Sequence, residues 1–391
     1  PWCKLDKVKF LCPVPGYDRH FAITEHFGIE MVNVPMTPTG PDMDIVEKLV
    51  AEDDSIKGIW CVPKYSNPQG ITYSDETVHR FACLKPAAKD FRIYWDNAYV
   101  IHHLYEDDQP VLLDIISECE KAGNPDLVYE FASTSKISFA GAGISALASS
   151  KANLEDVKKQ LTIQTIGFDK LNQLRHVRYY KNLDGMKAHM KKHANIMRPK
   201  FEAVLEVLEK ELGGLGIANW IKPKGGYFIS FDAMEGCAKE IVKKCKEAGV
   251  ILTNAGATFP YGKDPKDSNI RIAPSFPTAE EMAQAANLFV LCVKLVSVEK
   301  LLEAHQSVFL LMGGKENLKS LCRRLERSGW GDIWVSAGIR LGYPEEIILI
   351  EKVRELCEQE TDSLVAVILD HPDTFQEKLK MRELVKTRAE F

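Results

Sequence analysis

The first half of the chain alternates short apolar runs with polar, glycine-containing segments. Three of the apolar runs, at 59–63, 91–95 and 127–131, have the length and the aromatic and β-branched content of buried strands. Segments with helical signals separate them, as the crossover connections of a mostly parallel sheet require. The pattern therefore predicts an α/β fold with such a sheet over residues 1 to about 170.

A strongly helical pattern follows from Asp169 to Leu212 and ends at a glycine-rich segment, 213–216. Further on, 269–274 alternates like a strand, and the capping-box pattern of 278–281 opens a long apolar helix to about residue 305. We expect a large domain with this bridging helix, a smaller α/β domain and an extra C-terminal α/β unit, over residues 1–195, 196–305 and 306–391.

The C-terminal unit has its own alternation of strand and helix signals. The expected elements are strands at 308–312, 332–336 and 364–369, helices at 318–327 and 347–359, and a turn at 313–317. The stretch Leu341-Gly342-Tyr343-Pro344-Glu345-Glu346 resembles part of the C-terminal lobe of a precorrin-type tetrapyrrole methylase. The glycine-rich first lobe of that family has no counterpart here, so we expect no methyl transfer.

Polar side chains follow the strand-like runs of the first half in the order Asn67, Asp96, Tyr99, Lys136. The carboxyl ends of parallel strands are where open α/β sheets bind ligands. Lys136 lies in a small, hydroxyl-rich turn, and a desolvated lysine amine loses its proton readily and forms a Schiff base with an aldehyde. Each residue also has an ordinary structural explanation, as a turn, cap, core or surface residue, and the ordered set favours a site.

Four motifs extend this pattern into a family resemblance. The chain reads P-G-Y-D-R-H-F at 15–21, V-P-K-Y-S-N-P-Q-G at 62–70, W-D-N-A-Y at 95–99 and S-T-S-K-I-S-F-A-G-A-G at 133–143. In this order they resemble the class I, aspartate-aminotransferase-like members of the fold-type I pyridoxal-phosphate aminotransferases. The resemblance covers about residues 5–300.

The resemblance implies pyridoxal 5'-phosphate as cofactor and a role for each residue of the set. Asp96 would pair with the protonated pyridine nitrogen, and Tyr99 and Asn67 would hydrogen-bond the phenolic oxygen of the ring. Lys136 would form the Schiff base and then move the proton between substrate and cofactor.

Three more side chains receive roles from the same resemblance. Ser133 and Ser135 are candidate donors to the cofactor phosphate, and Arg271 would bind the substrate carboxylate, which its planar guanidinium matches bidentately. Asn67 would also lie at the substrate. Gly225 and Gly226 would permit close backbone approach where the small domain begins.

Two departures concern the phosphate. Many class I enzymes have an arginine eight residues after the lysine, where this chain has Ile144. The family's phosphate cup and N-terminal segment lie before the strand that ends at 13–15, so the chain looks N-terminally truncated, as from a truncated or spliced reading frame. We therefore expect weak, reversible cofactor binding and little turnover.

Composition argues against several other classes of protein. The formal net charge of −5 gives no bias toward nucleic acid, and no apolar run has the length of a membrane span. The ten cysteines show no metal-ligand spacing, so we expect no metal site and reduced thiols in a cytoplasmic protein. The resemblance implies a homodimer.

The expected function is transfer of an amino group between an amino acid, aspartate or a similar one, and a 2-oxo acid. A β-lyase or decarboxylase is an alternative, because Asp96, Tyr99 and Lys136 serve those reactions too. The chain could also be a non-catalytic effector-binding module or an inactive remnant of an enzyme.

Overall fold

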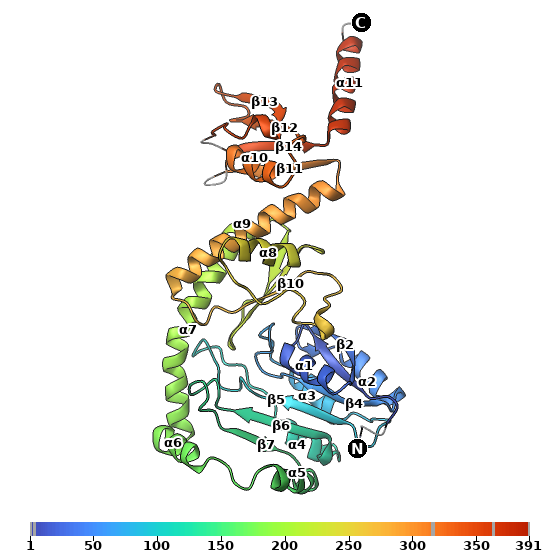
Figure 1. Ribbon diagram of the computed structural model, residues 1–391, viewed down its shortest axis with the longest axis vertical. Coiled ribbons are helices and arrows are strands. Elements are labelled where there is room, and N and C mark those ends of the chain that lie inside the picture. The colour runs from blue at the N-terminus through green and yellow to red at the C-terminus, as the bar shows by residue number, and fades with distance from the viewer. Residues whose placement is uncertain (1, 3–4, 314–316, 362–363, 390–391) are drawn as a thin grey trace. The chain divides into compact units, whose positions relative to one another are not determined.

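The computed structural model describes residues 2, 5–313, 317–361 and 364–389. The chain divides into two compact units, Pro1–Val290 and Leu291–Phe391. Strands occur in both units (Figure 1). Each unit also has its own apolar core. Among the described residues, no helix combines the length and apolarity needed to cross a membrane.

A seven-stranded sheet forms the main layer of the first unit, in the order β3-β2-β1-β4-β5-β6-β7 (Figure 1). Its core strands β2, β1, β4, β5 and β6 pair in parallel, while β3 and β7 are antiparallel edge strands. The strands are β1 (Lys9–Val14), β2 (Glu30–Thr37), β3 (Gly40–Pro41), β4 (Ile56–Cys61), β5 (Arg92–Asp96), β6 (Val128–Ser133) and β7 (Ser145–Ala148). The predicted α/β class and mostly parallel sheet are confirmed.

The main core lies on one face of this sheet. Leu11, Ile59, Ile93 and Val128 point from the central strands toward apolar residues of three helices, including fully buried Phe81. Burying such a shared apolar face is the largest favourable contribution to folding. These helices are α2 (Met43–Glu52), α3 (Asp75–Ala82) and α4 (Ile115–Lys121), and the short 3-10 turn η2 (Pro125–Leu127) follows α4.

The opposite face carries a smaller cluster around Phe21 of α1 (Asp18–His26), packed on Cys12, Val14 and Met31. Consecutive residues of a strand point to opposite faces, so β5 contributes to both sides of the sheet. Tyr94 packs near Trp60, whereas Trp95 packs on the opposite face. This alternation places Asp96 on the α1 side of the sheet.

The predicted long helix is two helices. After α5 (Lys151–Gln164), α6 (Lys170–Tyr180) is terminated by Lys181, the residue after its last turn, which has a φ of 64°. A new helix, α7 (Leu183–Leu212), follows. The Asn182 side chain accepts a hydrogen bond from the Gly185 amide and so caps α7. Because the Asn182 side chain bonds to the backbone of α7, it favours a helix start at this point over continuation of α6. The spacing of apolar residues does not reveal such a break.

A three-stranded antiparallel sheet, β10-β9-β8, follows α7. Its elements are β8 (Ala218–Trp220), β9 (Ile229–Ala233), α8 (Ala238–Glu247), the 3-10 turn η3 (Pro260–Gly262) and β10 (Asn269–Ile272). The chain then enters α9 (Ala279–Ala304), whose capping box is formed as predicted: the Glu281 amide donates to Thr278 Oγ1 and the Thr278 amide to Glu281 Oε2. The apolar pattern thus located this helix correctly.

The second unit contains an antiparallel sheet in the order β11-β14-β12-β13, with α10 against it. Its elements are β11 (Ser307–Met312), α10 (Leu318–Arg327), β12 (Trp334–Ile339), β13 (Ile347–Lys352), the 3-10 turn η4 (Val353–Glu355), β14 (Val365–Asp370) and α11 (Pro372–Ala389). Of the predicted turn at 313–317, residues 314–316 lie outside the described residues.

The predicted helix at 347–359 is wrong. Ile347, Ile348 and Ile350 belong to β13, which pairs antiparallel with β12, and η4 follows at once. Branching at Cβ restricts χ1 in a helix and suits the pleated surface of a strand. The resemblance of this unit to a tetrapyrrole methylase lobe stays a prediction.

Candidate functional site

The carboxyl ends of β4, β5 and β6 lie side by side, because these three strands are consecutive neighbours in the sheet. Asp96 is the last residue of β5 and is paired with Phe131 in the register of β6. Ser133 closes β6, and the turn with Lys136 follows directly. The polar residues predicted to follow successive strands are therefore brought to one edge of the sheet.

Asp96 is held by a histidine that the sequence analysis gave no role. Nε2 of His20, on α1, donates to Asp96 Oδ2 across 2.9 Å. The imidazole stacks on Trp60, with ring centroids 4.3 Å apart and 12° between the planes. Tyr17 meets the same imidazole edge-on at 5.0 Å. The aromatic contacts fix the ring, and the ring fixes one carboxylate oxygen of Asp96.

Lys136 lies over the ring of Tyr99, with Nζ 5.1 Å from the ring centroid. Tyr99 is 3% exposed, and burial, together with smaller contributions from Tyr17 and Asp96, raises the pKa of its hydroxyl. The phenol therefore stays protonated at neutral pH and can donate a hydrogen bond beside the lysine amine.

Side-chain hydrogen bonds hold the backbone of the turn that contains Lys136. The Tyr227 hydroxyl donates to the Lys136 carbonyl at 2.9 Å, and His102 Nε2 lies 3.4 Å from the same oxygen. Burial lowers the pKa of His102 to about 3, so this imidazole is neutral near pH 7. Tyr227 also hydrogen-bonds His193 Nε2 at 3.0 Å. These contacts hold the lysine backbone while its side chain stays free to react.

Two glycines bring the Tyr227 segment close enough for this anchor. A Cβ on Gly225 would lie 2.4 Å from the His102 carbonyl, and Gly226 has a φ of 83°. The Gly226 amide donates to that same carbonyl at 2.9 Å. The predicted close backbone approach at these glycines is confirmed.

Arg271 of β10 reaches the strand edge from a position far along the chain. Its Nη1 donates to Asn67 Oδ1 at 3.1 Å and to Asp18 Oδ1 at 2.8 Å. The guanidinium carbon lies 4.9 Å from the ring centroid of Phe228. One side of the guanidinium thus has protein partners, and the Asp18 carboxylate occupies a position that a ligand carboxylate could take.

Ser133 and Ser135 lie on the turn before Lys136 and bond to each other. The Ser133 hydroxyl donates to Ser135 Oγ at 3.0 Å, and the Ser135 amide donates to Ser133 Oγ at 3.1 Å. Neither residue is buried. Their hydroxyls are open to a ligand, and no hydrogen bond joins them to Asp96 or Arg271 among the described residues.

Unsatisfied polar atoms test whether the residues present fit pyridoxal phosphate. Asn67 Nδ2 and Arg271 Nε are buried and have no hydrogen-bond partner among the described residues. Buried polar groups in folded proteins are almost always paired, so these two donors are suited to acceptor atoms of a ligand. A phenolic oxygen and a carboxylate are such acceptors, and the Asp96 carboxylate is an anion suited to a protonated ring nitrogen. The donor set fits the expected cofactor.

Five residues of this site were not predicted from the sequence: His20, Tyr17, Asp18, Tyr227 and His102. His20, Tyr17 and Asp18 lie inside the motif P-G-Y-D-R-H-F, and their position in that motif was the available signal. Tyr227 follows Gly226, where the small domain was expected to begin. No clustering of histidine, cysteine and carboxylate side chains suited to a metal occurs among the described residues.

Comparison with known proteins supports this geometry. The family model described as aspartate amino-transferase matches residues 1–305. A putative aminotransferase of Mycolicibacterium smegmatis is 51% identical over 303 residues, which cover 77% of this chain and 70% of that protein. An aspartate aminotransferase of Corynebacterium glutamicum is 47% identical over 299 residues, 76% of this chain and 69% of that protein.

Solved structures agree with the sequence relatives. The crystal structure of an aspartate transaminase from Corynebacterium glutamicum superposes with a TM-score of 0.75 at 47% identity, over 77% of this chain and 70% of that one. A putative aminotransferase from Corynebacterium diphtheriae gives 0.75 at 49% identity, over 76% and 73%. The α-aminoadipate aminotransferase LysN from Thermus thermophilus, complexed with N-(5'-phosphopyridoxyl)-L-leucine, shares the fold at 19% identity and a TM-score of 0.65, over 75% and 72%. The predicted fold-type I aminotransferase resemblance is thus confirmed over residues 1–305, and the chain belongs to the aspartate aminotransferase family.

Proposed function

We propose that this chain binds pyridoxal 5'-phosphate and transfers an amino group from an acidic amino acid, aspartate or a similar one, to a 2-oxo acid. Family membership supports the reaction class, and the name of the Corynebacterium glutamicum relative supports the donor. The observation that carries the proposal is the juxtaposition of Lys136 with Tyr99 at the strand edge that also holds Asp96 and Arg271.

Asp96 is the proposed partner of the pyridine nitrogen. When bound, pyridoxal phosphate supplies an electron sink for the carbanion formed at the substrate α-carbon. Asp96 keeps the nitrogen protonated through its negative charge, and the His20 hydrogen bond at 2.9 Å orients the carboxylate for this task.

Lys136 is the proposed covalent anchor and proton carrier. Its amine lies over the Tyr99 ring, and the Tyr99 hydroxyl is the proposed donor to the phenolic oxygen of the cofactor. The Tyr227 and His102 contacts to the Lys136 carbonyl restrict the backbone, so the moving part is the lysine side chain alone. Such positioning is what general acid–base catalysis requires.

Arg271 and Asn67 are the proposed substrate contacts. The substrate carboxylate would replace Asp18 at Nη1 of Arg271 and bind the fork formed by the two terminal guanidinium nitrogens. Asn67 Nδ2 is the proposed second donor to the phenolic oxygen. Ser133 and Ser135 are the proposed hydroxyl donors to the phosphate. Homodimer formation stays a prediction from the family resemblance, checked by light scattering of the purified chain.

Borohydride trapping tests the assignment of Lys136. The chain is mixed with pyridoxal phosphate, reduced and mapped by peptide mass spectrometry, and the pyridoxyl label is expected on Lys136. Lys136→Arg keeps the charge and should take no label at this peptide, while Lys151→Arg, an exposed lysine, should leave the label in place.

A transamination assay with L-aspartate and 2-oxoglutarate accompanies the labelling. Turnover lost in Lys136→Arg and kept in Lys151→Arg supports the proposal. A label confined to another lysine, or turnover that survives Lys136→Arg, contradicts it. Release of carbon dioxide or ammonia in place of a new amino acid would show that another reaction takes place.

A further inference from the structure

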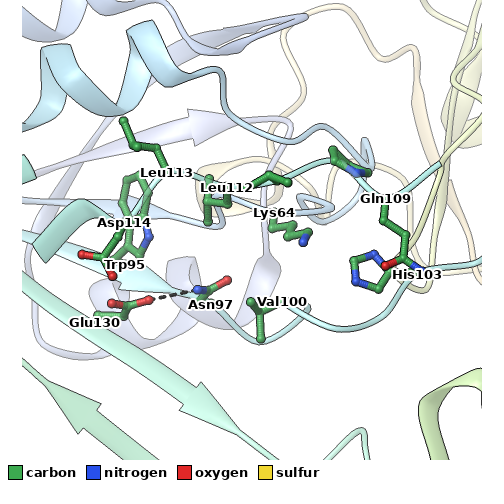
Figure 2. Close-up of a pocket in the computed structure, with 12 residues that line it drawn as sticks. Lys64, Trp95, Asn97, Val100, His103, Gln109, Leu112, Leu113, Asp114 and Glu130 are labelled. Carbon is green, nitrogen blue, oxygen red and sulfur yellow. Dashed lines mark hydrogen bonds between the residues drawn. The ribbon is translucent and has the colours of Figure 1, made fainter. Parts of the chain in front are cut away.

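The first unit contains a second polar cavity, on the opposite side of β5 from Asp96. It has a volume of about 330 Å³, within the range of small-molecule sites. Figure 2 shows Trp95 and Asn97 in its wall, and these are the residues on either side of Asp96. Trp95 packs against Tyr73 and lies in the main core, away from His20. The cavity is therefore separate from the proposed cofactor site.

One end of the cavity presents hydrogen-bond donors. Lys64 is 6% exposed and forms no ion pair with any described residue. His103 also lines the cavity, and its Nδ1 is 2.6 Å from the Tyr65 hydroxyl. Burial raises the pKa of Tyr65 and lowers the pKa of His103 to about 4, so the phenol donates and the neutral imidazole keeps its proton on Nε2. A buried ammonium without a counterion is costly, and a carboxylate would supply the missing charge.

The other end presents acceptors. Asn97 Nδ2 donates to Glu130 Oε1 at 2.9 Å, which fixes the amide so that Oδ1 is the free oxygen (Figure 2). Asn97 Oδ1 is buried and has no hydrogen-bond partner among the described residues. Asp114 lies at the same end (Figure 2). Burial raises the pKa of Glu130, and a cation beside the carboxylate would reverse that cost. This end is suited to an ammonium group.

The lining also contains the aliphatic side chains of Val100, Leu112 and Leu113. Figure 2 shows Lys64 near the centre of the cavity, with His103 on the right and with Glu130 and Asp114 on the left. Asn97 lies between Lys64 and Glu130, Leu112 and Leu113 lie above, and Val100 lies below. A ligand that satisfies every part of this lining carries an anion, a cation and an aliphatic group. Simple anions satisfy only the Lys64 end.

We propose that this cavity binds one free aliphatic α-amino acid, with its carboxylate at Lys64 and His103 and its ammonium at Glu130 and Asn97 Oδ1. Its side chain packs on Val100, Leu112 and Leu113. The Asn97 oxygen is buried and unsatisfied, and Lys64 is 6% exposed with no ion pair to any described residue. This ligand would give a partner to both side chains. The inference is independent of the transamination proposed above, because none of these residues belongs to the Lys136 site.

Isothermal titration calorimetry with L-valine tests the proposal on the full chain. L-Valine is expected to bind with one equivalent. The analogues 3-methylbutanoate, which lacks the ammonium, and 2-methylpropylamine, which lacks the carboxylate, are expected to bind at least about tenfold more weakly, since each loses its charge-assisted contacts. Equal binding of either analogue, or no saturable binding of L-valine, overturns the proposal.

Three variants separate the two sites. Lys64→Met keeps the unbranched side chain up to the ε position and removes the ammonium group. It is expected to weaken L-valine binding about tenfold or more. Lys85→Met is an exposed control outside the cavity and should leave binding unchanged. Arg271→Gln disables the proposed carboxylate contact of the cofactor site and should also leave L-valine binding unchanged.

Loss of L-valine binding in Arg271→Gln with retention in Lys64→Met would place the ligand at the other site and reject the inference. If Lys64→Met does not fold by circular dichroism, Glu130→Gln decides. Its amide oxygen can still accept from Asn97 Nδ2, but it lacks the charge for an ammonium, so about a tenfold loss supports the proposal. Unchanged binding in that variant contradicts it.

Discussion

Asp96 combines a reactive position with an unusually well-fixed orientation. It ends a buried strand, and the stacked His20 holds one of its oxygens. A carboxylate fixed in this way needs little reorganisation to stabilise a cationic ring nitrogen. The residue therefore contributes more to the proposed chemistry than to folding.

Replacing the Asp96 carboxylate by an amide tests whether the residue contributes more to catalysis than to folding. We expect Asp96→Asn to lower kcat by about 100-fold or more, because the neutral amide no longer holds the pyridinium proton. The free energy of unfolding should change by only about 1 kcal/mol, because the amide oxygen still accepts from His20. Transaminase kinetics and urea unfolding measure the two effects.

Asp90→Asn is the matched control, since Asp90 makes an exposed ion pair with Lys57 far from the site. It should leave kcat unchanged. Turnover of Asp96→Asn near the parent rate would mean that Asp96 is not the partner of the ring nitrogen.

A second prediction concerns the ion pair between Asp18 and Arg271. An intramolecular carboxylate competes with the substrate carboxylate for the same guanidinium. We expect Asp18→Asn to lower KM for the amino-acid substrate about three- to tenfold with a small change in kcat, because about 1 kcal/mol of competition is removed.

Steady-state kinetics measures KM and kcat separately and so checks this prediction. Asp54→Asn, an exposed residue away from Arg271, should change neither constant. A raised KM in Asp18→Asn would show that Asp18 contacts the substrate itself or positions Arg271 for it.

At the scale of elements, the lysine turn is supported by a segment more than 90 positions away in the chain. The backbone of 102–104 bonds to that of 224–226, and Tyr227 reaches the Lys136 carbonyl. The neutral, buried His102 lies at the centre of this contact. This support should therefore depend on pH.

The direction of the pH dependence of stability follows from the pKa of His102 in the folded and in the unfolded chain. Its folded-state pKa is lowered to about 3 against 6.5 in the unfolded chain, so between these values the unfolded chain binds a proton that the native state does not. The free energy of unfolding should fall as pH falls below about 6.5, by up to about 1.4 kcal/mol per pH unit from this group. Urea unfolding at pH 7 and pH 5 measures the loss.

His102→Gln removes one titrating group and should make the pH dependence shallower, leaving the contribution of His103, whose pKa burial lowers to about 4. His26→Gln, at an exposed position, should leave the pH dependence unchanged. The same slope in the parent and in His102→Gln would show that other groups cause the acid sensitivity.

At the scale of the whole molecule, the chain has two units with separate cores. The first unit buries its main core between the seven-stranded sheet and α2, α3 and α4, and the second buries its own between the antiparallel sheet and α10. Separate cores are the physical basis of separate cooperative unfolding. We therefore expect two thermal transitions.

A core truncation in the second unit tests this expectation. Leu325 is fully buried in its core, and Leu325→Ala should cost about 2–5 kcal/mol and lower one transition in calorimetry while leaving the other in place. Leu341→Ala, at a half-exposed position of the same unit, should change the temperature of that transition little. A single transition that moves as a whole in Leu325→Ala would contradict independent unfolding.

The order of residues along the chain was sufficient for the class of protein. The strand-like runs, the four motifs and the capping box of α9 are local signals, because their spacing follows from the geometry of one strand, turn or helix. They located β4, β5 and β6 and the residues Asn67, Asp96, Tyr99 and Lys136. The same local reasoning failed at β13, where an aliphatic run fits more than one period and the partner strand decides.

The contacts that hold the site were decided only by the tertiary structure. His20 and Asp96 are 76 positions apart, and Asn67 and Arg271 are 204 apart, so neither hydrogen bond has a signature in local spacing. The second cavity arises because β5 exposes alternate residues to opposite faces, and only the packing of helices and loops on the far face leaves space there. A sequence alone determines which side chains are available and where short elements form; the burial of a charge and the partner of a polar atom depend on segments that folding brings together.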